Sequence, residues 1–263
     1  MLDASSPFAS FQAPPGPASL IDLAARRLRQ AIVSCELAPG DFVNEASLSE
    51  RFGLGRAGVR VALTALAAAG FIARHARQGW RIAPVGGALA EAVLDARRRL
   101  EPSLAEARLS AADGAALRQL CEMAASAEGR PEHAALAVAR AADRQIRNRL
   151  AAHAGPIAAR WLDDVWDHAD RITRSLDLAG HSIAGAAWAP AIEALVARDR
   201  SAAASAIRGE IERFAVAVAR GLMATEARRS KPLMRSARRR RGKKGGAMTA
   251  SASGSSHLQE KQR

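Results

Sequence analysis

The fold of this chain is decided by residues 46–83, which read ASLSERFGLGRAGVRVALTALAAAGFIARHARQGWRIA. Two helices are predicted here: a short one over Ala46–Phe52 that ends at Gly53, and a longer one from about Gly55 to Gly70. The longer helix carries its large apolar residues at helical spacing on one face, namely Val59, Ala62, Leu63 and Leu66. This spacing predicts a helix that packs on a small core.

A β-hairpin is predicted directly after these helices. Phe71–Arg74 and Trp80–Ala83 are β-compatible segments, and the polar turn His75–Gly79 joins them. Upstream, apolar residues at helical spacing predict a first helix over residues 19–35, with Ser19 as its N-cap. Helix, short helix, tight turn, longer helix and hairpin follow in the order of a winged helix-turn-helix, which we place at residues 18–86.

The longer helix carries side chains that suit DNA. An α-helix fits the major groove of B-DNA, where residues at its N-terminus reach base edges. Arg56 and Arg60 lie four residues apart, so they share one face at the start of the helix. Arginine is suited to bidentate contact with guanine or phosphate. The alternative is that both arginines form only a solvated helix face, but the ordered pattern around them favours DNA contact.

Residues 20–84 resemble the DNA-binding domain of the GntR superfamily of bacterial transcription regulators. The matching residues are Ile32, Leu37, Pro39, Gly40, Asn44, Glu45, Leu48, Ser49, Phe52, Gly53, Leu54, Arg56, Val59, Arg60, Ala62, Leu63, Leu66, Gly70, Phe71, Ile72 and Gly79. The resemblance implies a DNA-binding surface made of Arg56, Ala57 and Arg60 on the helix and of His75, Arg77 and Gly79 in the wing.

The recognition segment departs from the family pattern. Gly55 and Ala57 replace hydroxyl residues that commonly cap this helix and touch phosphate, and Ala46 replaces a common arginine. Gly58 weakens the helix start by about 1 kcal/mol relative to alanine. The domain is therefore expected to bind DNA with modest affinity.

Residues 87–225 are predicted to be almost entirely helical, which gives a mainly α chain with an all-α antiparallel helical bundle as second domain. The expected helices are 88–110, 113–127, 132–153, 156–178, 187–198 and 200–222. Such a bundle can hold a ligand between its helices. Placed after the winged helix, it resembles the FCD ligand-sensing and dimerisation domain of the FadR-like GntR subfamily, through Arg97-x-x-Leu100-Glu101 and Asp143.

Many FCD domains bind a divalent metal through one Asp and three His. Asp143 matches the Asp, but Arg147, Trp188 (or a neighbour) and Glu210 stand at the His positions. An arginine is a poor neighbour for a bound dication, so we predict neither a metal nor another cofactor.

Two readings of Arg147 remain. It forms a buried ion-paired network with Asp143 and Glu210, or it joins Arg97 in binding the carboxylate or phosphate of a small organic effector. We therefore name Arg97, Asp143, Arg147, Trp188 and Glu210 as the candidate effector site.

Other titratable and aromatic side chains are expected to be structural. The histidines are predicted to be solvated or capping, the tryptophans to be core or pocket wall, and the aspartates to form a solvated or ion-paired face: His153, His168 and His181; Trp161, Trp166 and Trp188; Asp163, Asp164 and Asp167. We find no nucleophile–base pair, phosphate-binding glycine loop or metal-ligand spacing, so an enzyme is not expected.

The formal net charge is +13, from 39 Lys and Arg against 26 Asp and Glu. Most of it falls in residues 226–263, which contain all the lysines and which we predict to be a disordered basic tail. Residues 1–17, rich in Pro and Ser, are predicted to be a flexible leader. Two cysteines far apart and no long apolar run are typical of a cytoplasmic protein without a membrane segment.

These observations predict a homodimeric, ligand-responsive regulator that binds a double-stranded DNA operator, with a small organic acid as effector and repression as its mode. The alternative is a protein that binds nucleic acid without sequence preference, nucleoid-associated or RNA-binding, through its basic tail.

Overall fold

The computed structural model describes residues 17–127 and 133–245. The chain divides into two units, Met1–Leu222 and Met223–Arg263. The predicted leader lies outside the described residues except for Pro17, as does the end of the predicted tail from residue 246 onward.

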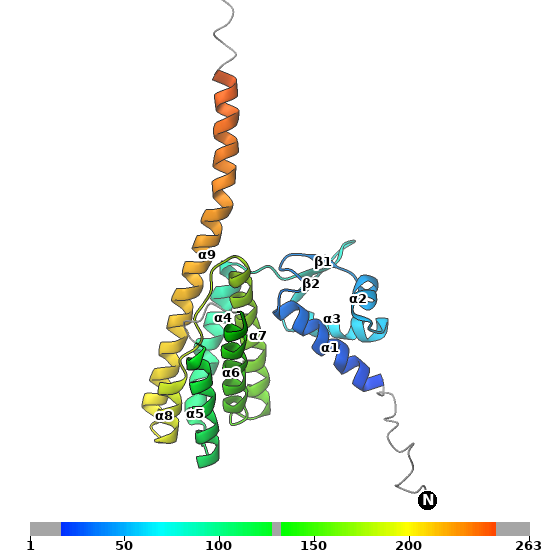
Figure 1. The fold of residues 1–263 in the computed structure, drawn as a ribbon. Helices are drawn as coiled ribbons and strands as arrows, with labels where there is room; N and C mark the ends of the chain where they lie inside the picture. The colour runs from blue at the N-terminus through cyan, green and yellow to red at the C-terminus, as the bar shows by residue number, and fades with distance from the viewer. Residues whose placement is uncertain (1–16, 128–132, 246–263) are drawn as a thin grey trace, which may run out of the picture. The chain divides into compact units, whose positions relative to one another are not determined.

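The N-terminal part is a winged helix-turn-helix, as predicted (Figure 1). Its elements are α1 (Pro17–Val33), β1 (Phe42–Val43), α2 (Glu45–Phe52), α3 (Arg56–Ala68), β2 (Ile72–His75) and β3 (Gly79–Ile82). Helix α1 packs on α3, and the apolar faces of the helices and the sheet enclose a core. Its fully buried members include Leu28, Ile32, Val59, Leu63, Phe71 and Ile82.

Two helix starts differ from the sequence predictions. Helix α1 begins at Pro17, so Ser19 lies inside its first turn and is not the N-cap. Proline is favoured there because a first-turn N–H has no helical partner. Helix α2 begins at Glu45, where the Asn44 side chain accepts a hydrogen bond from the Ser47 N–H (2.9 Å).

Strand β1 was not predicted. It is two residues long and pairs antiparallel with β3, with Phe42 opposite Arg81 and Val43 opposite Trp80. The sheet order is β1-β3-β2, so β3 is the central strand. A strand this short has no periodicity of its own and forms because β3 offers it a free edge.

Gly79 allows β1 to approach β3. Its φ is +90°, and a β-carbon there would lie 2.7 Å from the carbonyl oxygen of Val43. Both the left-handed backbone and the close contact exclude an ordinary side chain. The structure therefore gives Gly79 a role in the sheet, in addition to its predicted place in the wing.

We expect Gly79→Ala to lower the free energy of unfolding by about 1–3 kcal/mol, because it adds both backbone strain and a clash. Chemical denaturation of the purified variant measures this. Gly87→Ala is the control, since its β-carbon meets nothing within 4 Å at the start of α4. Equal stability of wild type and Gly79→Ala would show that β1 does not depend on this contact.

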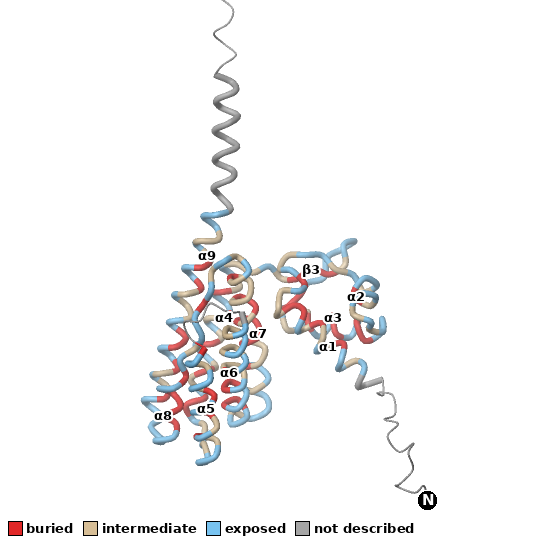
Figure 2. Tube along the Cα trace, viewed as in Figure 1, coloured by how far each residue is buried: buried red, intermediate tan, exposed pale blue. Residues whose placement is uncertain are grey.

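The second part of unit Met1–Leu222 is a helical bundle, and the mainly α class is confirmed. Its elements are α4 (Gly87–Leu100), the 3₁₀ helix η1 (Glu101–Glu106), α5 (Ala111–Ser126), α6 (His133–Ala151), α7 (Pro156–Leu178), α8 (Ala189–Val196) and the part of α9 (Arg200–Gly245) up to Leu222, where the first unit ends. Figure 2 shows buried positions along the facing sides of these helices. The largest core cluster includes Leu117, Ile146, Leu150, Leu162, Trp166, Ile192, Ile207 and Ile211.

The bundle differs from prediction at both ends. The expected helix 88–110 stops at Leu100 and becomes the 3₁₀ helix, because Pro102 lacks the N–H that an α-helix needs there. Helix α9 continues past residue 225 to Gly245, into the segment that the sequence predicts as a disordered tail. Glu226, Ala227, Arg228 and Arg229 favour a helix and directly follow position 225.

Among the described residues, no helix is both long and apolar enough to cross a membrane.

Candidate DNA-binding surface and ligand pocket

Helix α3 presents Arg56, Ala57 and Arg60 to solvent at its N-terminal end. Gly55 is the N-cap and supplies no side-chain cap, as its loss of a hydroxyl predicted. The Nε atom of Arg60 donates to Oε2 of Glu45 at the start of α2 (3.0 Å), and the Arg60 side chain is 71% exposed. The predicted helix contacts therefore lie on one accessible surface.

Gly58 faces the other way and is buried against α1. A β-carbon there would lie 3.4 Å from Cβ of Ala24, an ordinary contact distance. The backbones of α1 and α3 thus run close together at the start of the recognition helix.

The wing presents His75 and Arg77 to solvent and keeps Gly79 half-buried. Arg77 occupies the turn with φ +66°, and the ring of His75 packs edge-on against Phe42 (centroids 5.3 Å apart). Five of the six predicted DNA-binding residues are thus exposed.

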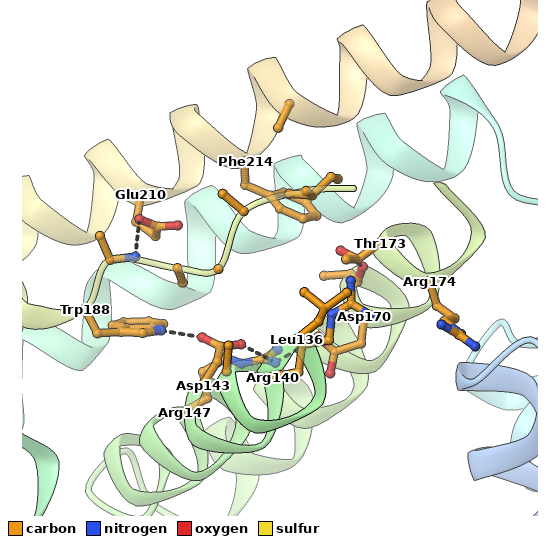
Figure 3. Close-up of a pocket in the computed structure, with 18 of the residues that line it drawn as sticks. Leu136, Arg140, Asp143, Arg147, Asp170, Thr173, Arg174, Trp188, Glu210 and Phe214 are labelled. Atoms are coloured by element: carbon orange, nitrogen blue, oxygen red, sulfur yellow. Dashed lines mark hydrogen bonds and ion pairs between the residues drawn. The ribbon is translucent and has the colours of Figure 1, made fainter. Parts of the chain in front are cut away.

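A pocket of about 530 Å³ lies among α1, α4, α6, α7, α9 and the segment that precedes α8 (Figure 3). All five residues of the candidate effector site line it: Arg97, Asp143, Arg147, Trp188 and Glu210. Its apolar wall includes Leu136, Ile183 and Phe214. The structure thus brings the predicted residues into one cavity that has both charged and apolar surface.

Arg147 is buried and paired with two carboxylates. Its Nη2 lies 2.7 Å from Asp143 and 2.8 Å from Asp170. Burial alone would lower the pKa of Arg147, but these two carboxylates raise it above its usual value, so the guanidinium stays charged. The predicted ion-paired network is confirmed for Asp143.

The predicted pairing of Arg147 with Glu210 is wrong. Glu210 instead accepts hydrogen bonds from Arg213, three residues along α9, and from the Ala187 N–H (3.1 Å). Burial raises the pKa of Glu210, and those two donors oppose the rise. Asp170 takes the place expected for Glu210, because α7 packs against α6 in this fold.

The oxygens of Asp143 do not fit a metal site. One accepts the Trp188 indole N–H (2.6 Å), and the other pairs with Arg147. The described residues hold no group of three or more His, Cys, Asp or Glu side chains placed to bind a metal ion. A cation at this place would have to displace a guanidinium from its own carboxylates.

Arg97 lines the pocket from α4, and its guanidinium also contacts Glu101 and Phe214. Its Nε and Nη2 donate to the two oxygens of Glu101 (2.5 and 3.2 Å), and its guanidinium lies over the ring of Phe214 (4.5 Å). Glu101 is fully buried and also accepts the Trp166 indole N–H (2.8 Å). Arg97 is thereby fixed in position at the pocket wall.

Sequence reasoning missed several residues that line the pocket: Gln30, Val33, Ser34, Arg140, Asp170, Arg174, Arg213 and Phe214. Two of them, Arg140 and Asp170, could have been predicted from the charge pattern of the sequence. Arginines on α6 and aspartates on α7 each recur at helical spacing, which is typical of two facing charged helix surfaces.

The aspartates at 163, 164 and 167 form the ion-paired face that was predicted. Arg29 of α1 pairs with Asp164 (2.6 Å) and with Asp167, and Arg144 of α6 pairs with Asp163 (2.5 Å). They therefore join α7 to both α1 and α6.

His168 corrects the prediction of a solvated or capping histidine. It is buried, its ring stacks on Phe71 (centroids 3.9 Å apart), and its Nε2 lies 2.9 Å from the carbonyl oxygen of Ala69. A carbonyl only accepts, so Nε2 carries the proton. Through these two contacts, His168 packs α7 against the C-terminal end of α3.

The tryptophans divide differently from the prediction. Trp166 is core and Trp188 is pocket wall, as predicted, but Trp161 is 55% exposed.

Both cysteines are free, and burial raises the pKa of Cys121 to about 11.

We expect His168 to make the protein less stable in mild acid. Burial lowers its pKa, and Arg171 and Arg29 lower it further, against the opposing effects of Ala69 and Asp164. Because the unfolded chain binds this proton more readily, stability is full above the ordinary histidine pKa of about 6.5 and falls as the pH drops through it. Melting temperatures at several pH values between 5 and 8 measure the effect. A His168→Gln variant should show a shallower decline, and an unchanged decline would contradict the prediction.

Residues 20–82 match the family described as bacterial regulatory proteins, gntR family. Two solved structures have the same fold. McbR/YncC of E. coli is 16% identical, with a TM-score of 0.58 over 77% of this chain and 98% of that one. A protein from Rhodococcus sp. RHA1, described as transcriptional regulator GntR, is 18% identical, with a TM-score of 0.56 over 75% and 96%. No curated protein sequence matches.

Proposed function

We propose that this chain, a GntR-type bacterial transcription regulator with its DNA-binding domain at residues 20–82, binds a pseudo-palindromic operator as a homodimer and releases it when a small organic acid enters the pocket. A regulator of this type binds DNA and is not an enzyme. Its place of action would be the cytoplasm, and its mode repression.

The observation that carries the DNA part is the exposed row of Arg56, Ala57 and Arg60 on the first turns of α3. The N-terminal turns of a recognition helix reach base edges, and a two-fold dimer would place two such helices in successive major grooves. Arg77 at the turn of the wing offers a third cation, which could contact the DNA backbone.

The chemistry of the pocket favours an anion with an apolar body. Five arginines line it against three carboxylates, which leaves an excess of positive charge, and Phe214 and Ile183 supply apolar surface. The Nε atom of Arg147 is buried and finds no acceptor among the described residues, which is costly unless a ligand or water accepts from it. A carboxylate would satisfy this donor.

Retardation of a DNA fragment that carries the promoter of the protein's own gene tests the DNA part. We expect a discrete complex at low salt that a random fragment of equal length does not displace. If both fragments compete equally, the proposal of a specific operator fails.

A thermal-shift screen of organic acids, sugar acids and amino acids tests the ligand part, with and without a chelator. We expect a carboxylate to raise the melting temperature in both conditions, because binding to the folded state stabilises it. Stabilisation by zinc or manganese that the chelator reverses would contradict the prediction of no metal.

The basic composition of residues 226–263 supports a second candidate function. In this function the tail binds nucleic acid without sequence preference. Removing these residues separates the two functions. Retained operator preference with weaker, less salt-dependent binding supports the regulator, and loss of all binding supports the tail.

A further inference from the structure

A continuous series of ion pairs leaves the pocket and ends at the DNA-binding domain. It begins at Asp143, which also accepts a hydrogen bond from the Trp188 indole N–H (2.6 Å). Asp143 pairs with Arg147 (2.7 Å), and Arg147 pairs with Asp170 of α7 (2.8 Å). All four residues line the pocket, so a ligand there would lie against this end of the series.

The middle of the series is Arg144, one turn from Arg147 on α6. Its Nη1 contacts both Asp170 (3.1 Å) and Asp167 (2.6 Å), and its Nη2 contacts Asp163 (2.5 Å). Burial alone would lower the pKa of Arg144, but the surrounding carboxylates raise it, so it stays charged. Asp170 therefore contacts both Arg147 and Arg144. Asp167 in turn contacts both Arg144 and Arg29.

The far end is Arg29 on α1. Its Nε donates to Asp167, the carboxylate that Arg144 also holds, and its Nη2 donates to Asp164 (2.6 Å). Its guanidinium lies over the ring of Phe71 (4.9 Å), a core residue that follows α3. Arg29 therefore joins the series to the helix on which α3 packs.

We propose that this series, Asp143–Arg147–Asp170–Arg144–Asp167–Arg29, couples the pocket to the DNA-binding domain. The coupling rests on the proposed function in that the ligand is an anion that binds in this pocket. The mechanism is competition for shared carboxylates. An anion on Arg147 releases Asp170 to Arg144, Arg144 then holds Asp167 less firmly, and Asp167 binds Arg29 more firmly. Occupancy of the pocket thus tightens α1 against α7.

A purely static network would have the same contacts, so the test must detect an effect at a distance. Asp170→Asn removes the shared charge with little change of shape, which turns Arg144 toward Asp167 and weakens the hold on Arg29. Asp177→Asn is the matched control. Asp177 is also an α7 carboxylate paired with an α6 arginine, Arg140, but it is not part of the series.

Hydrogen exchange of the backbone amides of residues 20–33, in the full chain without ligand or DNA, gives the readout. We expect these α1 amides to exchange about threefold to tenfold faster in Asp170→Asn, which corresponds to the lower part of the range of coupling within one ion-pair network. In Asp177→Asn they should exchange as in wild type. Unchanged α1 exchange in Asp170→Asn, or equal acceleration in both variants, overturns the proposal.

A second variant decides the matter if Asp170→Asn also loosens α5 and α8, which lie outside the series. Arg144→Lys keeps the charge but cannot bridge several carboxylates at once. Because Arg144→Lys then holds Asp167 less firmly, Asp167 should bind Arg29 more firmly. Slower exchange confined to α1 and its contacts supports the coupling, and unaltered or faster α1 exchange overturns it. Promoter retardation by the wild type is measured separately, so failure of the regulator proposal remains distinguishable from failure of the coupling.

Discussion

Glu101→Ala is expected to lower the free energy of unfolding by about 3–5 kcal/mol, because it leaves the buried guanidinium of Arg97 without its carboxylate. Arg97 is 5% exposed, and both of its donors toward η1 end on Glu101. The same change removes the acceptor of the Trp166 indole N–H. Chemical denaturation at one fixed protein concentration, followed by tryptophan fluorescence, measures the loss.

The adjacent arginine supplies a matched control. Arg98 makes a two-bonded pair with Glu212 (2.8 and 2.9 Å), but both side chains lie in solvent. Water replaces such a pair when it is broken, so Glu212→Ala should change stability little. Glu101→Gln keeps an acceptor for Trp166 and should fall between the two alanine variants. If Glu101→Ala and Glu212→Ala cost the same, burial does not set the strength of these pairs.

Local patterns made most of the winged helix predictable. The spacing of Val59, Leu63 and Leu66, with glycines at both ends, marks α3, and two short β-compatible segments around a polar turn mark the hairpin. Strand β1 could not be predicted in this way. It depends on a contact between Val43 and Gly79, residues that only the folded chain brings together. Pro102, in contrast, was a visible signal for the end of α4.

The residues that line the candidate pocket could be predicted in part from the sequence, but the ion pairs among them could not. A family resemblance placed Arg147 and Glu210 in one site, and both line the cavity. Which carboxylate Arg147 chooses depends on the rotation of α7 against α6, and no local pattern fixes that rotation. His168 was misjudged for the same reason, since its partners Phe71 and Ala69 belong to another part of the chain.

Arg56→Ala and Arg60→Ala are each expected to weaken operator binding by about 1–3 kcal/mol, or roughly 5- to 150-fold, because each removes a cation from the surface of α3 that we propose to enter the groove. Arg99→Ala is the control. It removes the same charge from an exposed position on α4, outside the DNA-binding domain, and should leave the affinity nearly unchanged. Titration of the promoter fragment with each variant gives the dissociation constants.

Repeating these titrations at several salt concentrations shows what each arginine contacts. An arginine that binds phosphate should reduce the salt slope by about 1 when it is removed and weaken all sequences alike. An arginine that binds a base should leave the slope almost unaltered and relax the sequence preference instead. Arg60 is oriented by its hydrogen bond to Glu45. Glu45→Gln should therefore alter the contribution of Arg60 to the affinity for DNA and leave the contribution of Arg56 unchanged. Equal losses in the Arg56, Arg60 and Arg99 variants would instead mean that the total charge governs binding, which is the behaviour of a protein that binds nucleic acid without sequence preference.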